Sequence, residues 1–261
     1  MKKIFASLLL GILGLSLTGC TRYGTYQDAD KYLMGNQTYS ESIASLDIDW
    51  VSGSLTLVED ANIQGVKVEE ETTFTDEKEL VHSYLNNGEL KIKFFASGHV
   101  RNDFAPFKKD LTITYHPGLN DLDIDLTSGT FKAETLTSDK VGIHFTSGSA
   151  DIGTIAANEV NVSLTSGDFA ANHVSATRFD SDMTSGSMNI GFDSVNKASF
   201  DLTSGNIDMA LPANGGKVKI HKTSGSVNTV RECSVNNDIY SFGEGTADIE
   251  VEMTSGRLTI R

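Results

Sequence analysis

The chain has 261 residues, and 35 aspartates and glutamates against 21 lysines and arginines give it a formal net charge of −14 at pH 7. So acidic a composition argues against nucleic acid or anionic lipid as the main ligand. Its length allows one large domain or two small ones.

Residues 1–19 have the composition of an export signal, with two lysines followed by an apolar run that ends at Leu17. The sequence LTGC, which ends at Cys20, resembles the lipobox of bacterial lipoproteins. This resemblance implies cleavage before Cys20 and acylation of its thiol and amino group, and two or more acyl chains anchor a protein stably in a membrane. We therefore expect an extracytoplasmic, membrane-anchored lipoprotein of a bacterial cell envelope. The alternatives are an ordinary secretory signal and a short membrane anchor.

Residues 21–42 are polar with scattered tyrosines, which predicts a tether between the lipid at Cys20 and a folded domain over residues 43–261. Within the domain, residues 43–120 predict irregular coils. In that part, residues 72–110 contain the turn sequence LNNGEL and predict a hairpin excursion. A partner could contact this charged segment, although a solvated excursion is the simpler interpretation.

The segment 121–261 contains a repeat. Thr-Ser-Gly occurs seven times, and its glycines are spaced by 19 residues four times, then by 20 and 31. A period near 20 that persists over several copies is typical of repeat architectures. Together with a Val-Ser-Gly copy upstream, the repeated glycines are Gly53, Gly129, Gly148, Gly167, Gly186, Gly205, Gly225 and Gly256.

Apolar and polar residues alternate on both sides of each glycine, which is the period of a β-strand. The apolar positions lie seven, five and three residues before the glycine, and two and four residues after it. A straight strand would place these two sets on opposite faces, so the chain must turn at Thr-Ser-Gly. Two further odd steps predict two more corners in each coil. Stacked coils of about 19 residues then form an all-β, right-handed parallel β-solenoid.

A serine that recurs in every unit could be a nucleophile, but no histidine recurs at a fixed offset to act as its base. Glycine at a tight corner has a structural reason, because a positive φ costs it little. We therefore predict corners rather than active sites, and no enzyme. A carbohydrate-active β-helix enzyme is the remaining enzymatic alternative, but the convergent acids and bases of a catalytic cleft are not evident.

An outward-facing column of residues, four before each glycine, is rich in acids. In this column Asp182 and Asp201 should be stacked, flanked by His221 and near Asp180. Like charges at this spacing repel, so a bound Ca²⁺ is one interpretation. The interpretation that we favour is a solvated acidic face, with counter-charges in the neighbouring column from Lys140, Arg178, Lys197 and Lys217.

The repeat is disturbed near its end. Lys222 interrupts an apolar column, and an insertion over residues 231–247 follows, which we expect to cover or distort the last coils. The final strand, residues 258–260, is predicted to be an exposed edge. Cys233 would be the remaining free thiol once Cys20 is lipidated, which excludes an intramolecular disulfide, and we expect it to be passive.

The Thr-Ser-Gly units, the upstream LDIDWVSGSLTL and the junction ITYHPGLNDLDIDLTSG together resemble the bacterial "putative adhesin" β-solenoid family over residues 43–261. The resemblance implies surface exposure and an adhesive or scaffolding role, and it offers no catalytic residues. We expect a non-enzymatic, lipid-anchored cell-surface protein whose solenoid binds an envelope or host ligand. The alternative is an envelope-stress accessory or sensor protein.

Overall fold

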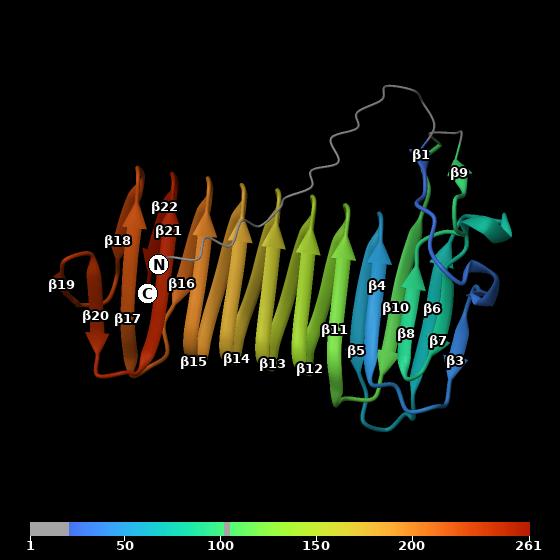
Figure 1. The fold of residues 1–261 in the computed structure, drawn as a ribbon, viewed down its shortest axis with the longest axis horizontal. Helices are drawn as coiled ribbons and strands as arrows, with labels where there is room; N and C mark the ends of the chain where they lie inside the picture. Colours follow the sequence, from blue (N-terminus) through green and yellow to red (C-terminus); the bar gives the residue numbers. More distant parts are fainter. Residues whose placement is uncertain (1–20, 102–104) are drawn as a thin grey trace, which may run out of the picture.

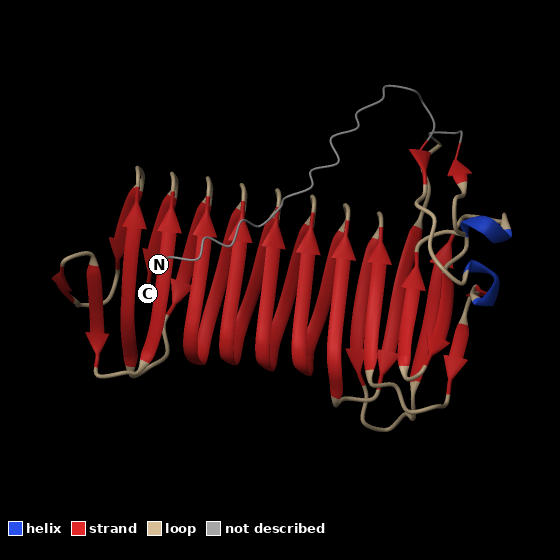
Figure 2. Cartoon of the chain, in the orientation of Figure 1, coloured by secondary structure: helices blue, strands red, loops and turns tan. Residues whose placement is uncertain are grey.

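The computed structural model of the protein describes residues 21–101 and 105–261, in which β-strands dominate (Figures 1 and 2). The predicted signal peptide and the predicted lipidation site at Cys20 lie outside the described residues. The described part has two short 3-10 helices, η1 (Ala29–Lys31) and η2 (Glu77–Glu79), and neither could cross a membrane. The strands are β1 (Thr21–Arg22), β2 (Leu33–Met34), β3 (Gln37–Tyr39), β4 (Ser45–Trp50), β5 (Ser54–Glu59), β6 (Val66–Thr72), β7 (His82–Asn86), β8 (Glu89–Lys93), β9 (Val100–Arg101), β10 (Lys109–Tyr115), β11 (Leu119–Leu126), β12 (Thr130–Phe145), β13 (Ser149–Leu164), β14 (Asp168–Met183), β15 (Ser187–Leu202), β16 (Asn206–Ala210), β17 (Gly215–Lys222), β18 (Ser226–Thr229), β19 (Ser234–Asn236), β20 (Ile239–Gly243), β21 (Ala247–Met253) and β22 (Arg257–Ile260).

The middle of the chain forms regular coils that confirm the predicted parallel β-solenoid. Each of β12, β13, β14 and β15 spans 16 residues, from one Thr-Ser-Gly turn to the next. Neighbouring strands pair in parallel and in register, so that Phe131 lies beside Ala150, and Ala150 beside Phe169. The coils wind in a right-handed sense (Figure 1). The buried positions of β12 change parity twice, between Ala133 and Leu136 and between Ser138 and Val141, so the two further corners expected in each coil are bends within an unbroken strand.

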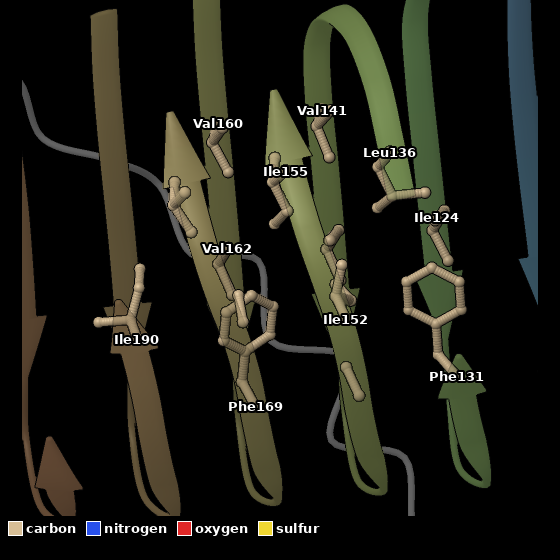
Figure 3. Close-up of a cluster of buried hydrophobic side chains, with 14 of the residues drawn as sticks. Ile124, Phe131, Leu136, Val141, Ile152, Ile155, Val160, Val162, Phe169 and Ile190 are labelled. Carbon is tan, nitrogen blue, oxygen red and sulfur yellow. The ribbon is translucent and has the colours of Figure 1, made fainter. Parts of the chain in front are cut away.

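The apolar columns fill the space between the two layers of strands (Figure 3). Ile124, Phe131 and Ile152 are fully buried, and each represents one of the positions predicted to face inward. Burying a side chain of this size stabilises the fold by roughly 1.5–3 kcal/mol. Every coil contributes several such side chains, so the stack is stable although one coil alone would not be.

The order of the coils in space differs from the order in the chain at the C-terminal end. β21 lies between β15 and β17, and β22 lies between β16 and β18, in parallel on both sides. The expectation of an exposed edge at residues 258–260 is therefore wrong, since Leu258 and Ile260 are fully buried. The outermost coil is formed instead by β17 and β18. The insertion contributes the antiparallel hairpin β19–β20, which covers β17.

The N-terminal end has a similar arrangement. β4 lies between β8 and β11, and β5 lies between β10 and β12, all in parallel. The predicted hairpin in residues 72–110 is confirmed, because β7 and β8 are antiparallel around a turn at Asn87 and Gly88. It does not project into solvent. Leu90 and Ile92 on β8 are fully buried, so the hairpin forms the first end of the stack.

The expectation of a polar tether over residues 21–42 is also wrong. β3 pairs with β6, and the buried Tyr39 hydroxyl makes a 2.8 Å hydrogen bond with Ser83 Oγ. Tyr23 and Tyr26 pack against each other, with ring centroids 6.3 Å apart. The polar composition of this segment obscured its tyrosines, whose large rings provide enough apolar area to hold it against the first coils.

Candidate functional site

The Thr-Ser-Gly corners stack directly on one another. At Gly167, φ is +133°, and a Cβ atom would lie 2.2 Å from the carbonyl oxygen of Gly148. The backbone ladder continues through the turn, because the N–H of Ser166 donates to the carbonyl of Thr146 at 3.0 Å. Both the backbone conformation and the close approach of the next coil therefore require glycine here. Ser166 therefore contributes to the turn through its backbone N–H.

A groove of about 1400 Å³ runs along the stack beside these corners. Its N-terminal end is lined by Tyr23 and Tyr26, and its far end by Asp238. The first column along it stands four residues before the glycines and consists, in spatial order, of Asp49, Asp125, His144, Ser163, Asp182, Asp201, Glu252 and His221. The second column stands two residues before the glycines and consists of Thr127, Thr146, Thr165, Thr184, Thr203, Thr254 and Thr223.

The structure changes the expected order of the acidic column. Asp182 lies beside Asp201 in the register of β14 and β15, as the repeat predicts. His221 is not the next residue, because the intercalated β21 places Glu252 between Asp201 and His221. Three acids therefore follow one another at about the 4.8 Å spacing of neighbouring strands.

These acids influence one another electrostatically. Burial raises the pKa of Asp201 above its ordinary value, and repulsion from Asp182 and Glu252 raises that pKa further. In the adjoining column, Asp180 is paired with Arg178, whose Nη2 lies 3.0 Å from Oδ1. The acids form a row along the stack rather than a cluster around a point. The described residues include no group of three histidines, cysteines or acids that could hold a metal ion.

The N-terminal half of the groove carries more counter-charge. His144 Nε2 lies 3.4 Å from Asp123 Oδ1. Their hydrogen bond raises the pKa of His144 and lowers that of Asp123. At the adjoining end coil, Lys93 Nζ bonds to Asp49 and lies 3.3 Å from Asp47 Oδ1. The unpaired negative charge of the groove is therefore greatest over the C-terminal coils.

A buried ion pair under the first coils was not predicted from the sequence. Lys109 pairs with Glu70, and both side chains are almost completely buried. Lys109 Nζ also donates to the carbonyl of Glu79 at 2.7 Å and lies 4.8 Å from the centre of the Phe94 ring and 5.2 Å from that of Trp50. Burial lowers the pKa of Lys109 to about 8. The sequence contained a signal for this buried lysine. In β10 every second residue faces inward, and Lys109 occupies one of these positions together with Leu111, Ile113 and Tyr115.

The chain matches a known family with a β-solenoid-like fold. The Toastrack DUF4097 family matches residues 56–261. The chain belongs to this family. The predicted resemblance to a β-solenoid family of unknown function is therefore confirmed, and this match points to no family of enzymes. Comparison with curated proteins found no match.

Solved structures from three bacteria resemble this Toastrack chain, at low sequence identity. A structure described as a "putative adhesin" from Bacteroides fragilis is 14% identical with a TM-score of 0.48, covering 88% of this chain and 97% of that chain. A structure from Parabacteroides distasonis, also described as a "putative adhesin", is 12% identical with a TM-score of 0.45 and the same coverage. A structure described as a "putative cell adhesion protein" from Clostridium sporogenes is 16% identical with a TM-score of 0.43, covering 88% of this chain and 99% of that chain.

Proposed function

We propose that this protein is a non-enzymatic cell-surface protein that binds an extended ligand along the groove of its solenoid. The observation that carries the proposal is the groove of about 1400 Å³, in which the same two columns of side chains continue from coil to coil. Each coil adds one residue to each of the two columns, at a spacing of about 4.8 Å from the neighbouring coil. A repeating surface of this kind suits a chain-like ligand, which can make similar contacts with successive coils.

The chemistry of the groove favours a hydroxyl-rich polymer without negative charge. Threonine hydroxyls both donate and accept hydrogen bonds, and carboxylates accept them, so together they can bind the hydroxyl groups of a polysaccharide. The row of Asp182, Asp201 and Glu252 would repel an anionic polymer. The nucleophile and base of a hydrolase need to lie within hydrogen-bond reach of each other. The threonine column and the acids instead repeat as separate rows.

We further propose that acyl chains on Cys20 anchor the protein in the membrane. The support is the apolar run that leads to LTGC in the sequence. An anchor of this type would place the solenoid outside the membrane, where envelope and host polymers are accessible.

Binding to polysaccharides tests the groove. A fragment of residues 21–261 is incubated with insoluble envelope and host-matrix polysaccharides, and the bound fraction is measured after sedimentation. Thr165→Trp fills the groove and is expected to reduce binding at least tenfold. The matched control, Thr177→Trp, lies at an exposed corner outside the groove and should bind normally.

Two results would contradict the proposal. Equal binding by the two tryptophan variants would show that the ligand lies elsewhere on the molecule. The release of reducing ends from any bound polysaccharide would show that the protein is an enzyme rather than a binding protein.

A further inference from the structure

The chain is fixed to the folded domain almost from the predicted lipidation site onward. β1 begins at Thr21, the residue after Cys20, and pairs with β9. The N–H of Tyr23 donates to the carbonyl of His99 at 2.8 Å. The Tyr23 ring packs edge-on against Phe95, with centroids 6.2 Å apart. An anchor at Cys20 would therefore hold the first end of the solenoid at the bilayer, without a spacer.

The same end of the solenoid exposes apolar side chains. Leu33 is 52% and Met34 is 45% exposed on β2, which pairs with β7 at the outer end of the stack. Val100 on β9 is 39% exposed beside the β1 strand. Met34 and Tyr26 line one open hollow, so Met34 lies beside the segment through which the chain enters the fold.

We propose that the first end of the solenoid rests on the membrane, with Leu33, Met34 and Val100 at the lipid interface. The inference rests on the proposed anchor at Cys20. The groove, whose first end is lined by Tyr23 and Tyr26, then starts near the bilayer and runs outward along the stack. Apolar side chains at the headgroup boundary add binding free energy to that of the acyl chains.

The opposite end is the competing contact surface, because it also exposes apolar side chains, including Val230 and Val235. It lies roughly 40 Å from the first end, at about 4.8 Å per coil. The position of Thr21 in the fold decides between the two ends. A chain anchored one residue before β1 can bring the first end to the bilayer without unfolding.

Depth-dependent fluorescence quenching tests this orientation. The full lipidated chain, carrying Cys233→Ser, is labelled with a fluorophore at Met34→Cys, or at Val230→Cys as the matched control. Each protein is reconstituted into phosphatidylcholine vesicles that contain a headgroup-nitroxide lipid. Quenching at position 34 is expected to exceed quenching at position 230 at least threefold. Labels at Leu33→Cys and Val100→Cys repeat the test in case Met34→Cys disturbs the fold, which the circular dichroism spectrum reports.

Failure of the orientation and failure of the anchor give different results. If the protein floats with the vesicles but the labels at both ends remain unquenched, or if position 230 is quenched more strongly, the proposed orientation is wrong and the anchor stands. If the protein does not float with the vesicles, the anchor at Cys20 is wrong, and the inference that rests on it is overturned as well.

Discussion

The carbonyl oxygen of Gly167 lies 2.0 Å from the position that a Cβ atom would occupy on Gly186, one coil further along the stack. Gly186 also has a φ of +117°, a conformation that other residues rarely adopt. Two separate requirements therefore select glycine at the same corner. The molecule provides a position at which these requirements can be separated, because Gly118 has a φ of +103° but no atom within 4 Å of its Cβ position.

Replacing Gly186 with alanine should destabilise the protein much more than replacing Gly118. Gly118→Ala introduces backbone strain alone, which costs about 1–3 kcal/mol. Gly186→Ala adds a collision with backbone that is fixed by the neighbouring coils, and we expect a loss of at least about 4 kcal/mol. Urea unfolding followed by circular dichroism measures both values. Similar losses for the two variants would mean that the corner requires glycine for its φ alone.

Removing one acid from the row in the groove should stabilise the protein at neutral pH. Asp182→Asn removes a charge that raises the pKa of Asp201, so this pKa should fall towards its ordinary value of 3.8. A raised carboxyl pKa means that the ionised form is less favourable in the folded than in the unfolded state. In the wild type, the free energy of unfolding should therefore increase as the pH falls through the raised pKa towards 3.8. At pH 7 the substitution should add about 0.2–1 kcal/mol.

Urea unfolding at low and high salt checks this effect, which should shrink as salt screens the repulsion. The control is Asp151→Asn, an exposed acid on β13 that lies beside Lys132 rather than beside other acids. This control should bring no gain. A loss of stability in Asp182→Asn would mean that an attractive interaction, such as a bound cation, holds the row together.

The regular part of the fold was predictable because each repeat shows the alternation of apolar and polar residues that a coil requires. The alternation around each glycine predicts which side chains face inward, and Phe131, Ile152 and Phe169 are buried as the pattern requires. The groove was predictable in part, since its acidic column is readable in the sequence. The N-terminal end of the groove was not predictable, because it is lined by Tyr23 and Tyr26, and a polar segment does not reveal that its tyrosines pack against the first coils.

The order of the coils was not predicted, although the residues hold a signal for it. The coil of β17 and β18 has Lys222 and Thr229 at positions that are apolar in other coils, and both side chains reach solvent. The coil of β21 and β22 has Met253 and Ile260 at the same positions, and both are buried. The coil of β17 and β18, which has fewer apolar side chains at the inward positions, occupies the end of the stack, where a lysine can stay hydrated. The spacing of the repeats alone does not predict which coil lies at the end of the stack.

Separating Lys109 from Glu70 should destabilise the first coils. Lys109→Met leaves the Glu70 carboxylate buried without its cation, and breaking a buried pair in this way costs about 3–5 kcal/mol. The double variant with Glu70→Gln removes the orphaned charge and keeps an oxygen for the N–H of Val81, which now donates to Glu70 at 2.9 Å. It should recover at least half of the loss in urea unfolding. A double variant as unstable as Lys109→Met would show that the aromatic contacts of Lys109 carry the effect.

The intercalated order of the last coils can be tested with two reciprocal substitutions at equivalent positions. In the structure Met253 is 3% exposed between β15 and β17, so Met253→Lys buries a charge without a partner. We expect it to lose at least about 3 kcal/mol in urea unfolding. Lys222 is exposed on the outermost coil, so Lys222→Met should change the stability by less than about 1 kcal/mol. If the coils were instead stacked in chain order, Lys222 would be interior and Met253 terminal. Lys222→Met would then stabilise the protein, and Met253→Lys would be tolerated.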